Sequence, residues 1–435
     1  MHDSCFLETA DRIGTRLCRD ALWSGDRCNW LGWAMEAVNG SWLTAYRAQG
    51  SSLYDGTAGI ALFLGRLYNF TRDALQKSAA LGALNHAISA AGDLDPTLRP
   101  ALYSGATGIA YATIELGVLF NDDRMVTQGL KALGSAAEIP DGYNWLDIIG
   151  GAAGAIQVLL EMADRFCDSD LKERALKHGR LLLRTAVKSD RGWSWDTLPG
   201  QTEKHLLGYG HGAGGIGAAL ARLWSATENA EYRDAALESF RYERSYFSPK
   251  DRNWPDLRSM AMYGVPKDQP VYAMAWCHGA PGIGLSRLCA AELMEDAEIL
   301  QELDDAVQTT AAACSNVVFP ASGSLCLCHG LGGNADLLLN AAELRDRQDL
   351  RSIAENVGHQ ANLQLVRDNL PWPCGVTGAG ETPNLMLGLA GIGHFYLRLY
   401  DSAQVPSILL LSSANQHRVT RPVVENSFTA ATAQS

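Results

Sequence analysis

A short glycine-led unit recurs seven times along the 435-residue chain and limits the possible folds more than any other feature of the sequence. Each copy is a Gly-x-x-Gly segment followed by small and apolar residues, as in Tyr54-DGTAGIALFL and Cys277-HGAPGIGLSRL. Successive copies lie 46 to 67 residues apart, and their first glycines are Gly56, Gly105, Gly151, Gly212, Gly279, Gly330 and Gly388. Because glycine permits tight turns and close packing, each copy predicts a tight loop that leads into a buried helix.

Amphipathic stretches lie between the glycine-led copies. Segments such as Leu171-KERALKHGRLLLRTAV and Glu231-YRDAALESFRYER carry charge on one helical face. A nearly apolar helix must be buried, and an amphipathic helix can cover it. Seven such pairs predict an all-α fold, an α/α toroid in which a closed barrel of seven inner helices is ringed by outer helices. An open solenoid is the rival fold, but solenoids end in polar caps, whereas the last copy, Leu387-GLAGIGHFYLRLY, is as apolar as the others.

Composition and charge exclude several classes of protein. The chain is 47% apolar and 19% charged, which is a globular composition. Its formal charge of −12 argues against nucleic acid or an anionic membrane as the main partner. No apolar run is long enough to span a bilayer, and the first residues lack the pattern of a signal peptide. A cytoplasmic protein is therefore expected, with its ten cysteines as reduced thiols or metal ligands.

The sequence divides into three parts. Residues 1–50 are expected to form an N-terminal helical segment that packs on the toroid, with a helix from Leu7 to Leu22 and a Trp-rich turn at Asn29-WLGWAM. Residues 51–411 are expected to form the toroid, and 412–435 a polar, loosely ordered tail. Three stretches rich in Pro, Gly, Asp and Trp, residues 191–204, 245–270 and 371–384, predict surface loops between inner and outer helices.

Aligning the copies on their first glycine places cysteines and histidines at equivalent positions. The residue directly before the glycine is histidine in three copies, and one place earlier stands cysteine in two of them; these residues are His211, His278, His329, Cys277 and Cys328. In a ring, equivalent positions lie at the same end near the axis, so these side chains can converge. Thiolate and imidazole suit a borderline-soft ion such as Zn²⁺, and three protein ligands with an open fourth position are typical of catalytic zinc.

The residue pattern leaves some roles open. His278 could be a ligand, a group that supports a ligand, or a substrate-site residue. His211 has no cysteine beside it, which favours proton transfer over metal binding. Cys326 lies two residues before Cys328 and falls off the repeat register, so it is not expected to be a ligand. Six other cysteines are expected to be packed thiols, namely Cys5, Cys18, Cys167, Cys289, Cys314 and Cys374.

The glycine-led repeats with Tyr209-GHG, Trp276-CHG and Leu327-CHG resemble the lanthionine synthetase C-like (LanC) family over most of the chain, from about Ser52 to Leu411. The segments Asn29-WLG, Asn253-WPDLR and Val405-PSILLL are most similar to the cyclase domain of class II lanthipeptide synthetases. In those enzymes the cyclase follows a large dehydratase domain. We therefore expect a separate dehydratase or kinase-type partner enzyme here.

The resemblance implies a zinc-dependent lanthipeptide cyclase. By motif match, one zinc ion per chain would be held by Cys277, Cys328 and His329, in agreement with the repeat register, and the catalytic pair would be His211 and Asp147. The implied reaction adds a peptide Cys thiol to dehydroalanine or dehydrobutyrine in the same dehydrated precursor peptide, which gives a (methyl)lanthionine thioether ring. Some class I cyclases have an arginine four residues before the first zinc cysteine; this chain has Ala273 there, so a proton-transfer scheme cannot be copied from class I.

The sequence leaves two other functions and a second rival fold to consider. A LanC-like transferase would use the same zinc to add an external thiol such as glutathione to dehydrated residues. A non-catalytic peptide-binding module would keep zinc as a structural ion. A glycosidase-type α/α barrel would need two carboxylates facing the axis, and only Asp55 and Asp147 lie near loop starts, in different registers.

Overall fold

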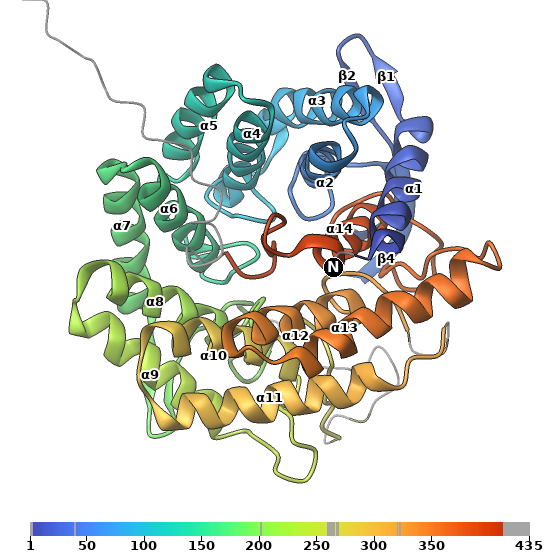
Figure 1. Cartoon of the computed structure of the whole chain (residues 1–435). Coiled ribbons are helices and arrows are strands. Elements are labelled where there is room, and N and C mark those ends of the chain that lie inside the picture. The colour runs from blue at the N-terminus through green and yellow to red at the C-terminus, as the bar shows by residue number, and fades with distance from the viewer. Residues whose placement is uncertain are drawn as a thin grey trace, which may run out of the picture.

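The computed structural model describes residues 3–38, 41–200, 202–258, 266, 269–319, 321 and 323–411. The predicted tail, residues 412–435, lies outside the described residues. Within these ranges the chain is mostly helical, and its helices form two concentric rings (Figure 1). The prediction of an all-α, α/α toroid fold is confirmed.

The inner ring consists of the helices that follow the seven glycine-led copies. They are α2 (Thr57–Thr71), α4 (Ala106–Phe120), α6 (Ala152–Phe166), α8 (Ala213–Thr227), α10 (Ala280–Leu293), α12 (Leu331–Arg345) and α14 (Leu389–Asp401). In every case the first glycine of the copy is the residue that caps the helix N-terminus. The second glycine is required by packing: at Gly59 and Gly391 a Cβ would overlap the carbonyl oxygen of the residue six places earlier, and the other five copies share this contact.

Each inner helix packs against one outer helix. The outer helices are α3 (Ala74–Ser89), α5 (Asp123–Ala136), α7 (Ser169–Thr185), α9 (Ala230–Arg244), α11 (Ala297–Ser315), α13 (Gln348–Ala361) and α1 (Ser4–Asp20). The N-terminal helix α1 packs on the last inner helix, α14, so the first and the last helix of the described chain form one pair. This pair completes the outer ring (Figure 1).

Short turns join most inner helices to their outer partners. In α4, for example, Asn121 ends the helix in a left-handed conformation (φ 58°), and the next residue, Asp122, accepts hydrogen bonds from the first amides of α5. A left-handed residue followed by an Asp or Asn cap also joins α2 to α3, α6 to α7 and α8 to α9. These tight turns all lie at one end of the barrel, so the longer outer-to-inner connections lie at the other end.

At that other end, the loops before the inner helices are joined by a belt of backbone hydrogen bonds. The belt consists of the residues two places before each first glycine: Tyr54, Tyr103, Ile149, Gly210, Cys277, Cys328 and Met386. The amides donate around the ring, from Tyr54 to Tyr103 O (2.9 Å) and from Gly210 to Cys277 O (3.3 Å), for example. The Met386 amide donates to Tyr54 O (2.9 Å) and so joins the last copy to the first. Among the described residues, only the junction between Cys277 and Cys328 has no such bond.

The segment 405–411 crosses the inside of the ring (Figure 1). Its carbonyl groups accept hydrogen bonds from side chains of inner helices and their loops: the Tyr103 hydroxyl binds Ile408 O, the Trp276 indole binds Leu409 O, and Arg222 binds Leu411 O. Nearly all of its residues are buried. The segment after α14 therefore lies inside the toroid, and Trp276 connects it to the neighbouring Cys277.

The N-terminal segment differs from the prediction. Two antiparallel pairs follow α1, namely β1 (Leu22–Ser24) with β2 (Arg27–Asn29) and β3 (Leu31–Val38) with β4 (Ser41–Ala48). The predicted Trp-rich turn is wrong, because it is strand: Trp33 pairs with Tyr46 across β3 and β4. A third pair, β5 (Val187–Ser189) with β6 (Gly192–Ser194), follows α7. Short helical turns at Ala91–Asp93, Pro96–Leu98 and Asn362–Val366 complete the described elements.

Candidate active site

The loops before α8, α10 and α12 bring the predicted site residues to one end of the toroid. Buried Glu243 of α9 holds the first of these loops, because its carboxylate accepts from the amides of Gly208 (2.7 Å) and Gly214 (2.9 Å). Arg287 pairs with the other oxygen of Glu243 at 2.7 Å. Asn253 holds the second loop in a similar way through the amide of Ala280 (2.7 Å). Interior ion pairs and amides thus fix the backbone that carries the site.

The thiols of Cys277 and Cys328 lie next to each other and interact. Both residues are buried, with 8% and 4% of their surface exposed. The contact with Cys328, together with burial, raises the pKa of the Cys277 thiol well above its usual value. Two adjacent buried sulfurs are costly to ionise by themselves, and a cation between them would remove that cost.

The His329 ring lies next to this pair of thiols. Its Nε2 lies 2.8 Å from the carbonyl oxygen of Gly375, so Nε2–H is a donor, and once the ring loses its second proton the lone pair lies on Nδ1. The ring also contacts the thiol of Cys326. Burial would lower the pKa of His329, but the Cys326 and Cys277 sulfurs outweigh burial and raise the pKa to about 10.

The donor set of Cys277, Cys328 and His329 fits a zinc ion by its chemistry. Two thiols and an imidazole are zinc donors, and an imidazole whose second nitrogen is bonded to a backbone carbonyl is the usual arrangement for a metal-binding histidine. The structure does not gather the three donor atoms into one cluster in which all lie within 4.8 Å of one another. The ring of His329 is turned toward Gly375 and Cys326.

A different trio does meet that distance criterion among the described residues, namely Asp3, Cys5 and His359 on the outer surface. Asp3 and His359 are each 46% exposed. The His359 ring uses opposite nitrogens, with Nδ1 3.8 Å from the Cys5 sulfur and Nε2 3.5 Å from Asp3. One ion can bind only one nitrogen of a ring, and Asp3 already caps helix α1 through Cys5 N. This trio is a weaker candidate than the buried thiols.

His211 and Asp147 form a hydrogen-bonded pair. The Nδ1 of His211 lies 2.6 Å from Oδ2 of Asp147, and Oδ1 of Asp147 accepts from the amide of Gly150 at 2.6 Å. The His211 side chain is 24% exposed, whereas that of Asp147 is 4% exposed. Burial would lower the pKa of His211, but the Asp147 carboxylate outweighs it and raises the pKa above the usual value. The pair can therefore hold a proton near neutral pH on a partly exposed ring.

His278 lies next to His211, with ring centroids 5.9 Å apart. Its Nδ1 lies 3.2 Å from Leu207 O, and its buried Nε2 has no hydrogen-bond partner among the described residues. Burial, and then the nearby Arg258, lower the pKa of His278 to about 3. The ring is thus neutral, and the unpartnered Nε2 is an acceptor.

Two groups at the site were not predicted from the sequence. Asp256 and Arg258, from the loop predicted to lie on the surface, form an ion pair beside His278 and the two thiols. The Tyr54 hydroxyl contacts the Cys328 thiol. Tyr54 could have been found from its position in the repeat register, which is equivalent to that of Cys277. The ion pair could have been found from the segment Asn253-WPDLR, which contains both of its residues.

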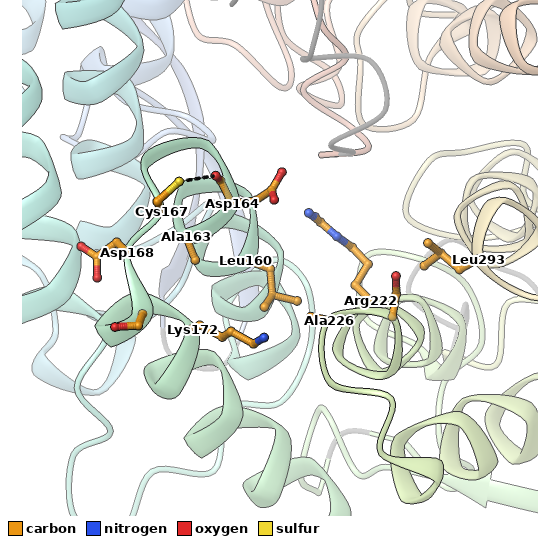
Figure 2. A pocket seen from close by; sticks show the side chains of 11 residues that line it. Leu160, Ala163, Asp164, Cys167, Asp168, Lys172, Arg222, Ala226 and Leu293 are labelled. Atoms are coloured by element: carbon orange, nitrogen blue, oxygen red, sulfur yellow. Dashed lines mark hydrogen bonds between the residues drawn. The ribbon is translucent and has the colours of Figure 1, made fainter. Parts of the chain in front are cut away.

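A pocket of about 540 Å³ lies elsewhere, at the C-terminal ends of α6 and α8 (Figure 2). Its lining includes Asp164, Cys167, Lys172 and Arg222. Helices of this length place it roughly 20 Å from the loops that carry the thiols. The pocket is therefore not part of the candidate active site.

Fold and site together define an α/α toroid with a cluster of thiols and imidazoles at one end of its barrel. The family model of lanthionine synthetase C-like proteins matches residues 47–410. The chain therefore belongs to the lanthionine synthetase C-like family.

Three similar proteins illustrate this relationship. The lacticin 481/lactococcin biosynthesis protein LcnDR2 of Lactococcus lactis subsp. lactis is 26% identical over 208 residues, which are 45% of this chain and 21% of that protein. The nisin biosynthesis protein NisC of the same organism is 24% identical over 314 residues, which are 65% of this chain and 71% of NisC. The solved structure of nisin cyclase has a TM-score of 0.63 at 18% identity, over 85% of this chain and 94% of that one. This structural similarity supports the fold alone.

No helix in the described part of the chain combines the length and the apolar character that a membrane span requires.

Proposed function

We propose that the protein is a zinc-dependent lanthipeptide cyclase. It adds cysteine thiols of a dehydrated precursor peptide to dehydroalanine or dehydrobutyrine residues of the same peptide, which forms lanthionine or methyllanthionine rings. The observation that carries the proposal is the juxtaposition of two buried thiols with a histidine–aspartate pair at the same end of the barrel. Membership of the lanthionine synthetase C-like family supports this reaction class.

In this proposal Cys277, Cys328 and His329 hold the zinc ion. When bound, zinc lowers the pKa of a substrate thiol, which is about 8.5 for a free cysteine, so that the thiolate is available near neutral pH. Tyr54 contacts Cys328 and supports its orientation. The Gly375 carbonyl fixes the tautomer of His329.

His211 supplies the proton. Addition of a thiolate to the β-carbon leaves an enolate, and this enolate must receive a proton at the α-carbon. The Nε2 of His211 has no hydrogen-bond partner among the described residues, whereas Nδ1 is held by Asp147. Asp147 thus orients the ring and favours its protonated form, which is the form that a general acid needs.

His278 binds the substrate backbone. Its neutral ring has an unpartnered Nε2 acceptor close to His211. A peptide amide of the substrate can donate to this nitrogen, which would satisfy a polar atom that is otherwise buried without a partner. The dehydrated residues themselves arise from serine and threonine, and we assign that step to a separate dehydratase or kinase-type partner enzyme.

The test uses a synthetic peptide with one dehydroalanine and one cysteine several residues apart. The zinc-loaded protein should remove the free thiol without changing the peptide mass, as followed by alkylation and mass spectrometry. Glutathione is added in a parallel reaction. A peptide that gains the mass of glutathione and keeps its thiol would favour the external-thiol transferase, and an unchanged peptide that is bound by the protein would favour a binding module.

A further inference from the structure

A guanidinium group lies among the side chains of the candidate active site. Arg258 follows Asn253-WPDL in the loop after α9, and its charge interacts with the thiols of Cys277 and Cys328. It also interacts with the rings of His211 and His278. The geometry that places Arg258 at the site is its ion pair with Asp256, which lies beside His278. A cation from a long loop is therefore within electrostatic range of the groups to which the proposed function assigns metal binding, proton transfer and substrate binding.

Asp256 holds this guanidinium in place. Its carboxylate accepts from Nε of Arg258 at 3.1 and 3.2 Å and from Nη2 at 2.6 Å, and one of its oxygens also accepts from the Arg258 amide at 3.0 Å. The Asp256 side chain is fully buried. Its amide donates to Val271 O at 2.7 Å, and its Oδ1 lies 4.0 Å from Nδ1 of His278. The ion pair is therefore anchored to the backbone and to the site.

The Nη1 group of the Arg258 guanidinium is available to a ligand. Among the described residues no acceptor binds Nη1 of Arg258, although Nε and Nη2 are both occupied. The side chain is 38% exposed, so a bound peptide can reach it. A fixed guanidinium with free N–H donors is suited to binding an oxygen that carries negative charge.

Thiol addition to a dehydrated residue creates such an oxygen. As the S–Cβ bond forms, the electron pair of the Cα=Cβ bond moves toward the carbonyl group, and the carbonyl oxygen becomes an enolate oxygen. The enolate then takes one proton at Cα, and the thiol has lost one, so the overall reaction needs no further reactant. Hydrogen-bond donors that bind this oxygen more strongly once charge develops on it lower the reaction barrier. Donors that bind the ground state and the transition state equally do not lower it.

We propose that Arg258 binds the carbonyl oxygen of the dehydrated residue and stabilises the enolate that forms on it, with Asp256 as its positioning residue. This inference rests on the proposed cyclase function. It assigns separate roles to the two cationic groups of the site: Arg258 acts on the oxygen, and His211 delivers the proton to carbon.

The test compares Arg258→Gln and Arg258→Lys with the matched control Arg252→Gln. Arg252 lies in the same loop but pairs with Asp305 on the outer surface at 2.6 Å, so its replacement makes the same charge change away from the site. With the dehydroalanine peptide, Arg258→Gln should lower kcat ~10²–10³-fold, the scale for loss of one oxyanion donor, with a smaller change in KM. Zinc content and the control should stay at the wild-type level.

A second reaction separates the proposed role from activation of the thiol. A peptide with alanine in place of dehydroalanine is alkylated at its cysteine by iodoacetamide in the presence of the zinc-loaded protein, a reaction that forms no enolate. We expect the wild type and Arg258→Gln to support this alkylation at equal rates. Equal losses in alkylation and cyclisation would overturn the proposal, since Arg258 would then act on the thiol.

Two further outcomes are decisive. A wild-type kcat for Arg258→Gln overturns the proposal while leaving the cyclase function intact. A wild-type protein that closes no ring contradicts the cyclase function itself and this inference with it. If Arg258→Gln loses its helical circular dichroism, Arg258→Lys decides: it keeps the charge but has fewer donors, so an intermediate loss in kcat supports the proposal and an unchanged kcat overturns it.

Discussion

The thiols of Cys277 and Cys328 contact each other at the one junction, among the described residues, where the belt of backbone hydrogen bonds has no bond. At the other junctions a loop amide donates to the carbonyl of a neighbouring copy, from Tyr54 around to Met386. Sulfur atoms thus lie at the site where the backbone makes no link of its own. A metal ion held by both thiols would complete the ring of contacts at this end of the barrel.

The first prediction concerns the glycine pairs that build the inner ring. Replacing Gly391 with Ala should destabilise the protein by about 1–3 kcal/mol, because the new Cβ overlaps the Leu385 carbonyl oxygen, which is part of a packed loop. The control Gly92→Ala lies in an exposed turn with nothing within 4 Å and should change stability by less than about 0.5 kcal/mol. Urea unfolding followed by circular dichroism measures both. Equal stability of the two variants would show that the glycine pairs are not a packing requirement.

The second prediction concerns the metal. Purified protein should contain about one zinc per chain, and Cys277→Ala or Cys328→Ala should reduce it sharply because each removes a thiolate donor. Cys289→Ala is the matched control, since this buried thiol of α10 faces Ala218 O at 3.9 Å, away from the site. Elemental analysis of the four proteins gives the answer. Full zinc in both site variants would refute this ligand assignment.

The third prediction concerns proton transfer. His211→Asn should retain zinc and slow cyclisation ~10²-fold or more, the usual scale for a general acid. Asp147→Asn should act in the same direction, and the double variant should lose less than the product of the two effects, since the residues act as a pair. His205→Asn, whose ring binds Ser194 at 2.8 Å, is the control. Loss of zinc from His211→Asn would make His211 a ligand instead.

The fourth prediction concerns pH. His211 must be protonated to act as an acid, so the rate should fall as the pH rises through its pKa, which Asp147 raises above the usual 6.5. Asp147→Asn removes the charge that outweighs burial, so the alkaline limb of the kcat profile should move to lower pH. The same pair contributes stability that is fully present below about 6.5 and is lost as the pH rises through the raised pKa. If the alkaline limb does not move in Asp147→Asn, the limb does not report the titration of His211.

The repeat made the fold predictable. Gly-x-x-Gly followed by an apolar run marks the N-terminus of every inner helix, because the helix needs two glycines to accept the preceding loop against its first turn. The hairpin of β3 and β4 was missed because its residues were interpreted as a turn around Trp30 and Trp33. Short strands outside the repeat produce no periodic signal long enough to outweigh the helical pattern of the rest of the chain.

The site was only partly accessible from the sequence. The repeat register predicted that Cys277, Cys328 and the histidines lie at one end of the toroid, because equivalent positions of repeats in a ring lie at the same end. Arg258 and Asp256 belong to no copy, and only the folded loop reveals that they lie beside His278. The contact of His329 with Cys326 was missed for the same reason: Cys326 is off register, yet the turn before α12 brings its sulfur to the His329 ring.

We propose that this chain closes thioether rings with the help of a metal held by Cys277, Cys328 and His329. The most direct measurement is the loss of free thiol from the dehydroalanine-and-cysteine peptide, scored by alkylation and mass spectrometry, with zinc-loaded protein, chelated protein and Cys328→Ala. Zinc-loaded protein should yield a thiol-free peptide of unchanged mass; the other two should leave the thiol free while keeping their helical circular dichroism. Equal ring closure by all three would show that ring closure does not depend on a metal held by these residues.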